Sequence, residues 1–400
     1  MSVDLLGPAN ATNAVTVQPA DTRTFGATDT FFKDCTGPGS KDGTKVMAAF
    51  LNGALQQVRR AIRGMAVTEN NADDDMLLKA IQTARDAYLI DTPTTKTVYG
   101  VGADFASLPA ALAWVSKYRI TQNGSVNFAL AAGQFVHTTA FLFDHPNMDR
   151  ITITGNGTPT PPTSFAYTGN SGAALTADQG SALTALRAAY PTELRLTSGA
   201  NMVGTKYFTL RNLLVTGDGT ITANGGMIFV QGGALLDRVS VHGAGGNGLV
   251  AQTSWVKLIT YFSATGNAYN GIENIGGGIF LNCRVLGCNN IGSGLHGVGG
   301  NILAATADIY KYNGNGYVGV SLDGTHINTD IAGGEIKNNG AGGFGGARMR
   351  GTLKGAVITG NTSYGVSVSY GTNVDFTGAT SQSYSPALNT VGNNNSYIVG

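Results

Sequence analysis

The pattern of apolar and polar positions predicts two short helices near the start of the chain. Apolar residues recur every three or four positions in two stripes, and three consecutive aspartates precede the second stripe. The stripes contain Met47, Leu51, Val58 and Ile62, and then Leu77 and Ile81. Because two short amphipathic helices cannot bury both stripes alone, we expect partner chains to cover them.

A different pattern begins at Phe208, where short apolar strands alternate with turns rich in Gly and Asn. The strands contain residues 213–215, 239–241, 258–262, 285–286, 309–310, 335–336 and 356–358. Asparagines mark the turns at Asn247, Asn267, Asn289, Asn313, Asn338 and Asn361. A repeat of 20 to 25 residues fits one coil of a parallel β-helix, in which neighbouring coils lie roughly 4.8 Å apart. Leucine-rich and propeller repeats are excluded, because their marker residues do not occur at this period.

Between these segments the pattern predicts the first coils of the β-helix. Residues 105–118 favour an amphipathic helix that closes the open end of the core, and 125–130 and 151–156 favour strands. Residues 157–195 are rich in Thr, Pro and Ala, which is typical of an insertion, with a short helix near 182–189.

We therefore predict an all-β main body, a right-handed single-stranded parallel β-helix, with a small helical base. The expected parts are an extended arm over 1–40, a trimerising base over 41–92, first coils with a capping helix and insertion over 93–195, and a shaft over 196–400. Of the 58 glycines, 41 follow position 200, which agrees with a series of tight turns in the shaft.

Charge and cysteine content exclude several classes of function. A net charge of +1 gives no long-range attraction to nucleic acid or to an anionic membrane. Three cysteines without framework spacing argue against disulfide stapling. The chain lacks a leader-like start and an apolar run of membrane-spanning length, so we expect a soluble protein without membrane insertion.

Several short segments in order resemble the attachment segment of bacteriophage and prophage tailspike or spike-fibre proteins. They are Phe-Phe-Lys-Asp-Cys-Thr at 31–36, Lys-Asp-Gly-Thr at 41–44, Phe-Leu-Asn at 50–52, Gln-Val-Arg-Arg-Ala-Ile-Arg at 57–63 and Asp-Asp-Met-Leu-Leu at 74–78. Residues 98–135 are similar to the first β-helix coil of tailspikes. The resemblance implies a homotrimer in a virion that is assembled in the host cytoplasm. It also implies attachment by the N-terminus to a tail, baseplate or capsid protein, with the β-helix facing a bacterial surface glycan.

Candidate chemistry in the sequence is sparse. The Gly-Ala-Gly-Gly-Asn-Gly run at 243–248 precedes a strand rather than a helix, so a dinucleotide site is not favoured. No histidine or cysteine pair has metal-ligand spacing, so we expect neither a metal nor a cofactor. Glycoside cleavage needs two carboxylates, and the candidates are Asp308, Asp330 and Glu335.

The carboxylate candidates depend on how the coils align. If Ile309 stacks on Ile331, Asp308 and Asp330 form a pair beside outward-facing Tyr310 and Tyr312. Alignment on the asparagine turns instead sets Tyr310 near Glu335 or Ile336 and removes the pair.

Aromatic side chains on the shaft predict sugar binding by ring stacking. The candidates are Trp255, Tyr269, Tyr310, Tyr312 and Tyr317. The favoured hypothesis is a virion spike that adheres to a host polysaccharide. One alternative is a tailspike depolymerase that cleaves capsule or lipopolysaccharide as a hydrolase or lyase, and another is a non-viral bacterial adhesin or polysaccharide enzyme.

Overall fold

The computed structural model describes residues 48–68, 75–168, 172–220, 226–304, 310–329, 334–385 and 396–399. The chain forms two compact units, residues 1–89 and 90–400. The first contains helices α1 (Ala48–Gly64) and α2 (Met76–Asp86), so both predicted helices are confirmed. Ile62 is buried, whereas Val58, Leu77 and Ile81 are 39%, 42% and 58% exposed. The side chains of Met47 and Leu51 lie outside the described residues.

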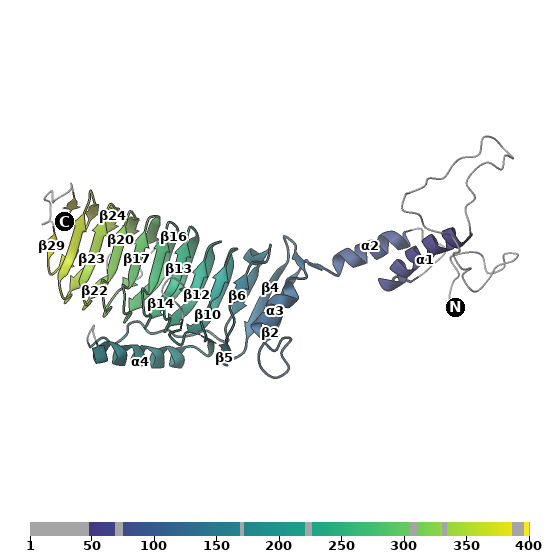
Figure 1. The fold of residues 1–400 in the computed structure, drawn as a ribbon, viewed down its shortest axis with the longest axis horizontal. Helices are drawn as coiled ribbons and strands as arrows, with labels where there is room; N and C mark the ends of the chain where they lie inside the picture. Colours follow the sequence, from purple (N-terminus) through teal and green to yellow (C-terminus); the bar gives the residue numbers. More distant parts are fainter. Residues whose placement is uncertain are drawn as a thin grey trace. The chain divides into compact units, whose positions relative to one another are not determined.

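The second unit is a parallel β-helix, which confirms the predicted fold class (Figure 1). Each coil contributes strands to three faces, which we call the first, second and third face in chain order. The third face is a sheet of ten strands, one for each of ten coils. Every strand pair between successive coils on the three faces is parallel.

The first two faces share four long strands that bend. They are β10 (Phe208–Thr216), β12 (Ala234–His242), β14 (Trp255–Thr265) and β16 (Gly278–Cys288). The first half of β10 pairs with β7 and its second half with β8, so one strand serves both faces. Asn212, Arg238 and Thr260 have φ of 55°, 51° and 63° at the bends, a left-handed conformation that turns the strand.

The remaining strands belong to one face each. The first face has β2 (Pro93–Val98), β4 (Ser125–Leu130), β7 (Ile151–Thr154), β18 (Asn301–Ala304), β21 (His326–Thr329), β24 (Arg350–Leu353), β27 (Asn373–Asp375) and β30 (Tyr397–Val399). The second face has β5 (Gly133–His137), β8 (Thr192–Leu196), β19 (Tyr310–Lys311), β22 (Glu335–Lys337), β25 (Val357–Thr359) and β28 (Thr380–Ser381). The third face has β6 (Phe141–Phe143), β9 (Met202–Gly204), β11 (Gly226–Val230), β13 (Asn247–Gln252), β15 (Ile272–Ile275), β17 (Leu295–Val298), β20 (Val320–Asp323), β23 (Gly342–Ala347), β26 (Tyr364–Ser369) and β29 (Tyr384–Ser385). A separate two-stranded pair joins β1 (Leu89–Ile90) and β3 (Arg119–Ile120).

A ladder of buried asparagines runs along the corner between the second and third faces. Its members are Asn267, Asn290, Asn315, Asn339 and Asn361, separated by 23, 25, 24 and 22 residues. Each side-chain amide donates to the next side-chain oxygen over 2.8 to 3.0 Å. Because every member is buried and hydrogen-bonded, the ladder fixes the register of the coils.

The ladder differs in detail from the sequence-based prediction. Asn267 and Asn361 belong to it, but Asn289, Asn313 and Asn338 each lie one or two positions before a ladder member. Asn289 and Asn338 have φ of 57° and 56°, so they form the turn itself. Runs such as Asn289-Asn290 hide this distinction in the sequence, because one residue turns the chain and the next enters the ladder.

A column of glycines lies beside the asparagine ladder at the start of the third-face strands. Its members are Gly248, Gly271, Gly294, Gly319, Gly343 and Gly365. A Cβ on Gly294 would lie 2.5 Å from the Gly287 carbonyl oxygen and 2.9 Å from the Asn315 amide nitrogen. Glycine is therefore needed here for close approach and not only for turns.

Helix α3 (Leu108–Val115) packs against the first coils, as predicted. Ser107 caps it by accepting a hydrogen bond from the Ala110 backbone over 3.3 Å. Leu108 and Val115 are buried. The Trp114 and Phe128 rings meet edge to face, with their centroids 6.4 Å apart, and Phe128 belongs to β4. A short 3₁₀ helix, η1 (Met148–Arg150), leads into β7.

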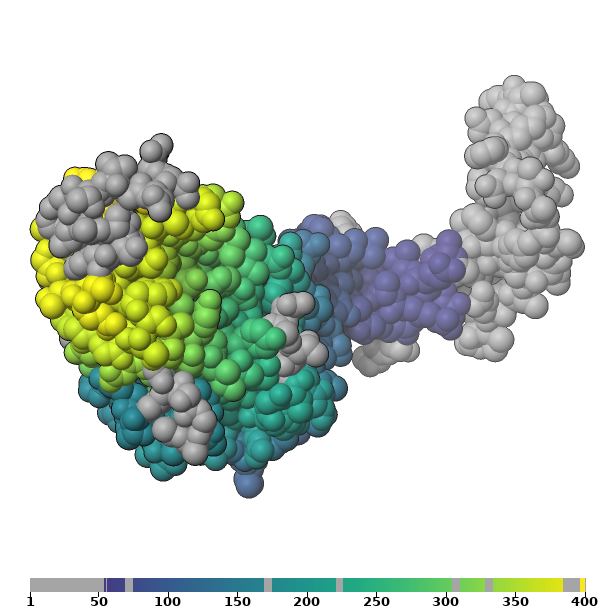
Figure 2. All heavy atoms as spheres, turned by 60° about the vertical axis from the view of Figure 1, so that its left-hand side comes forward, coloured from purple at the N-terminus to yellow at the C-terminus, as the bar shows by residue number. Residues whose placement is uncertain are grey.

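Helix α4 (Gly172–Ala189) lies within the expected insertion and is longer than predicted. It runs beside β10, β12 and the green coils that follow them (Figures 1 and 2). Its side chains at four-residue steps, Ala182, Leu186 and then Tyr190, are buried against Leu214 and Leu286 of the second face. The insertion therefore covers part of the second face. None of the described helices is long and apolar enough to cross a membrane.

Candidate functional site

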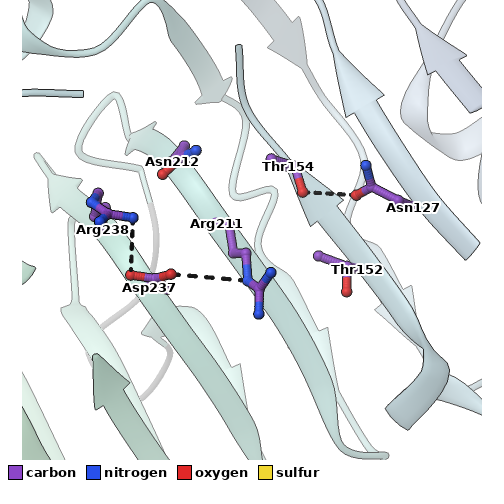
Figure 3. Close-up of a pocket in the computed structure, with 7 residues that line it drawn as sticks. All are labelled: Asn127, Thr152, Thr154, Arg211, Asn212, Asp237 and Arg238. Atoms are coloured by element: carbon purple, nitrogen blue, oxygen red, sulfur yellow. Dashed lines mark hydrogen bonds and ion pairs between the residues drawn. The ribbon is translucent and has the colours of Figure 1, made fainter. Parts of the chain in front are cut away.

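A hollow of about 380 Å³ opens on the first face, between the smaller side chains of two coils and the arginines of the next two (Figure 3). Strands β4, β7, β10 and β12 supply its lining, which is Asn127, Thr152, Thr154, Arg211, Asn212, Asp237 and Arg238. Thr154, Arg211 and Asp237 occupy equivalent positions on successive coils. Alternation along the strands turns these residues outward while their apolar neighbours fill the core.

The hollow carries two arginines and one carboxylate. Asp237 lies 3.9 Å from Arg211 Nε and 3.6 Å from Arg238 Nη1, as the dashed lines in Figure 3 show. Thr154 donates a hydrogen bond to Asn127 over 2.7 Å. The buried Oδ1 atom of Asn212 has no hydrogen-bond partner in the described part of the chain, and Asp237 Oδ1 has its ion pair with Arg238 but no hydrogen bond there. The hollow thus combines a surplus of positive charge with free hydrogen-bonding capacity.

An aromatic ledge formed by Tyr207, Trp255 and Phe280 lies near the start of the same face. Tyr207 is 37% and Trp255 49% exposed, and the Trp255 and Phe280 rings stack with centroids 4.9 Å apart. Gly233 and Gly278 occupy the neighbouring coils, and a side chain at either position would collide with a ring of the ledge. Tyr207 and Arg211 are four positions apart along an extended chain, so the ledge begins roughly 13 Å from the hollow.

The structure separates the five predicted aromatic residues into three groups. Trp255 belongs to the ledge. Tyr269 and Tyr317, 47% and 58% exposed, lie at the corner between the second and third faces. The Gly292 backbone of the intervening coil hydrogen-bonds to the backbone of both, so the two tyrosines are two coils apart. Sugar binding by these three residues stays a prediction.

Tyr310 and Tyr312 are only 4% and 2% exposed and pack in the core, so the prediction that they face outward and bind sugar is wrong. The coils align on the asparagine turns, which pairs Lys311 with Glu335 and brings the Tyr310 ring against Gly334. That register turns both rings inward, where glycine leaves room for them.

Glu335 is held in an ion-paired cluster on the second face. Its carboxylate lies 3.4 Å from both Lys311 Nζ and Lys337 Nζ, and Asn313 donates to it over 3.3 Å. Burial disfavours the charged form, but the two ammonium groups outweigh burial and lower the pKa of Glu335. An acid tied in this way is poorly suited to donate a proton. Asp308 and Asp330 lie outside the described residues.

The sequence analysis missed the hollow, although a signal for it exists. Arg211 and Asp237 are separated by 26 residues, about one coil, and opposite charges at that separation can face each other on adjacent strands. For a metal, the described ranges contain no group of three or more His, Cys, Asp or Glu side chains that could bind one.

Comparisons with known proteins give no family. No family model and no curated protein sequence matches the chain. One similar solved structure is the A-module of the mannuronan C-5 epimerase AlgE6 of Azotobacter vinelandii, with 15% identity, a TM-score of 0.42, and coverage of 72% of this chain and 80% of that one. Another is ORF18 of Geobacillus virus E2, with 10% identity and a TM-score of 0.34, where 91% of this chain covers 65% of the virus protein. At these identities, the likeness of this chain to either structure concerns the fold alone.

Proposed function

We propose that this chain is the spike of a bacteriophage-like particle, which adheres to a bacterial cell-surface polysaccharide through the first face of its β-helix. The observation that carries the proposal is the aromatic ledge beside the polar hollow. Rings exposed on a rigid scaffold can stack on sugars, and the arginines can bind an acidic substituent. A separation of roughly 13 Å suits an oligosaccharide better than a single sugar.

The helical base supports a trimer of this spike. Val58, Leu77 and Ile81 expose apolar surface in the single chain, which association of three copies would cover. Three linked copies would also raise the apparent affinity for a repetitive polysaccharide. The resemblance of residues 31–78 to phage attachment segments supports an anchor in the tail, baseplate or capsid, and hence a place in the virion. The full chain is expected to sediment at three times its monomer mass, and a stable monomer would contradict this part of the proposal.

Binding to a panel of purified capsules and lipopolysaccharides tests the function. Trp255→Ala should weaken binding of the recognised glycan at least about fivefold, because truncating an anchoring ring at a binding hot spot costs more than about 1 kcal/mol. Tyr370→Ala is the matched control, since Tyr370 is 62% exposed at the same corner of a later coil.

Equal loss of affinity in both variants, or no binding to any glycan by the wild-type protein, would contradict the proposal. New reducing ends or unsaturated sugars in the same samples would support the depolymerase alternative instead.

A further inference from the structure

Three side chains of different chemistry stand in one outward column of the third face. Glu273, His296 and Ser321 occupy equivalent positions on β15, β17 and β20, in three successive coils. Each alternates with buried neighbours, so all three point away from the core. Successive members of such a column are roughly 4.8 Å apart at their Cα atoms. An acid, an imidazole and a hydroxyl thus follow one another along the surface.

The imidazole is oriented by the acid. His296 Nδ1 lies 3.3 Å from Glu273 Oε1, and Asn247 donates a hydrogen bond to the other carboxylate oxygen. An ionised carboxylate only accepts, so Nδ1 carries the proton and Nε2 is left as the basic atom. The two nitrogens lie on different sides of the ring, so Nε2 points away from Glu273, and Ser321 occupies the position next to His296 on the following coil. The His296 side chain is 31% exposed, so a substrate can reach it.

The surface beyond Ser321 is open and ends at a phenol. Gly345 follows Ser321 in the column and has no side chain to fill the space. The Tyr364 ring lies across Gly342 toward Gly345, and its hydroxyl oxygen is 3.2 Å from the place where a Gly345 Cβ would be. A group bound between Ser321 and Tyr364 would therefore meet a hydroxyl on each side.

The charged neighbours of the column are largely neutralised. Asp323, two residues after Ser321 on the same strand, accepts a hydrogen bond from Arg348 Nε over 2.8 Å. This bond to Arg348 lowers the pKa of Asp323. Asp323 is thus paired with Arg348, and Glu273 is the carboxylate in contact with His296.

We propose that Ser321, His296 and Glu273 form an ester-hydrolysing site on the third face, with Tyr364 as the donor to the oxyanion. A nucleophile beside a base that a third group orients is the arrangement that acyl transfer needs, whatever the fold. The site lies apart from the first-face hollow and does not depend on the proposed adhesion.

The reaction follows from these positions. Ser321 Oγ attacks the carbonyl carbon of an ester while His296 Nε2 takes its proton, and Tyr364 donates a hydrogen bond to the oxygen that becomes negative. The carbon–oxygen bond of the ester breaks, the departing alkoxide receives the proton from His296, and the acyl group stays on Ser321. Water, deprotonated by His296, then releases the carboxylic acid and restores the serine. No other reactant is required.

The fitting substrate class is an O-acylated sugar. The site is an open surface, so the acyl group must be small and must project from a larger molecule. Tyr317, 58% exposed, precedes Ser321 by four residues on the same coil and offers a ring for stacking of the sugar.

Two assays on the full chain test the site: labelling by diisopropyl fluorophosphate, and acetate release from p-nitrophenyl acetate and from an O-acetylated bacterial capsule. We expect one phosphoryl adduct, located on Ser321. Ser321→Ala should abolish labelling, and His296→Ala should slow it by at least about 100-fold. Ser367→Ala is the matched control, because Ser367 lies in the same column two coils further on, and it should behave as the wild type.

An adduct elsewhere, no adduct at all, or equal labelling of His296→Ala and the wild type would overturn the proposal. Circular dichroism of each variant distinguishes lost chemistry from lost structure. Ser321→Ala should still bind the recognised glycan and Trp255→Ala should still hydrolyse the soluble ester, so each of the two proposals can fail separately.

Substitutions of Tyr364 and Glu273 should each change the kinetics of ester hydrolysis in a characteristic way. Tyr364→Phe removes the oxyanion donor and should lower kcat by about 100-fold with little change in KM. Glu273 is a positioning residue, so Glu273→Gln should lower kcat at constant KM, and Glu273→Asp should restore part of the rate. Equal rates in the Gln and Asp variants would contradict the role of Glu273.

Discussion

The second and third faces of the β-helix place similar side chains in different surroundings. On the second face, His242 Nδ1 lies 2.8 Å from Thr265 Oγ1 of the next coil and only 7% of the residue is exposed. On the third face, His296 lies beside Glu273 and Ser321 of the adjacent coils and its side chain is 31% exposed. The β-helix provides the same stacking in both places, and among the described residues helix α4 of the insertion packs on the second face.

Helix α4 buries the polar groups of the second face and thereby limits their chemistry. Arg187 of α4 binds Glu193 by two hydrogen bonds of 2.9 Å, and Thr216 donates to the same carboxylate over 2.6 Å. Burial lowers the pKa of nearby His242 to about 4. The hydrogen bonds of Arg187, Glu193 and Thr216 therefore hold α4 against the coils. The column of Glu273, His296 and Ser321 on the third face stays accessible to solvent and to ligands.

The largest expected effect comes from the asparagine ladder, which both faces share. The Asn315 amide oxygen accepts from Asn290 over 3.1 and 3.0 Å, and its nitrogen donates to Asn339 and to the Gly287 carbonyl over 3.0 and 2.9 Å. Asn315→Ala leaves these buried partners unsatisfied and should lower the free energy of unfolding by about 4 kcal/mol. Chemical denaturation checks this.

Hydrogen exchange then shows whether both faces loosen, as a shared ladder requires. The control is Asn373→Ala at an exposed strand position, which should change stability by less than about 0.5 kcal/mol. If Asn315→Ala disturbs one face alone, the ladder does not couple them.

A smaller effect, confined to the second face, is expected from Leu186→Ala. Leu186 is fully buried between α4 and the second face, and its truncation should cost about 3 kcal/mol. Amide exchange should accelerate in the second halves of β12 and β14 and stay unchanged in β15 and β17. Leu142→Ala, at a position 51% exposed, serves as the control.

Faster amide exchange on the third face in Leu186→Ala would show that helix α4 stabilises the whole coil and not the second face alone. The contrast between the two faces would then be lost.

The smallest expected effect is a pH dependence that originates at His242. Its pKa is about 4 in the folded chain against 6.5 for a free histidine, so between these values the unfolded chain binds more protons. Stability should therefore fall by roughly 2 kcal/mol from pH 7 to pH 5, and His242→Gln should remove this part of the slope.

His326→Gln, at an exposed position, is the control for replacing a histidine with glutamine. Glu193 contributes only at lower pH, because Arg187 and Thr216 outweigh its burial and lower its pKa. A wild-type slope in His242→Gln would contradict the assignment.

Sequence periodicity predicted the solenoid but detected mainly one of its faces. All strands expected from the repeat fall on the second face or in the bent strands that lead into it, where large aliphatic residues gather. The sequence pattern did not predict the third-face strands, because strands such as β23, Gly-Gly-Phe-Gly-Gly-Ala, contain a single large apolar residue. Their glycines are required by the adjacent ladder, and no local strand pattern shows this.

The candidate sites were less accessible to sequence reasoning than the fold. Trp255 was identified by residue type, but Tyr310 and Tyr312 were assigned to the wrong side of the chain because a shift of register reverses inside and outside. Glu273, His296 and Ser321 are 23 and 25 residues apart, and only the coil alignment brings them together.

By itself the sequence determined the coil period, the helical base and the fold class, since these depend on spacing along the chain and on local preferences. Tertiary structure alone decided which asparagines form the ladder, which aromatic rings face solvent and which face the insertion covers. The physical reason is that each of these depends on contacts one or more coils away, where a register difference of one residue exchanges core for surface.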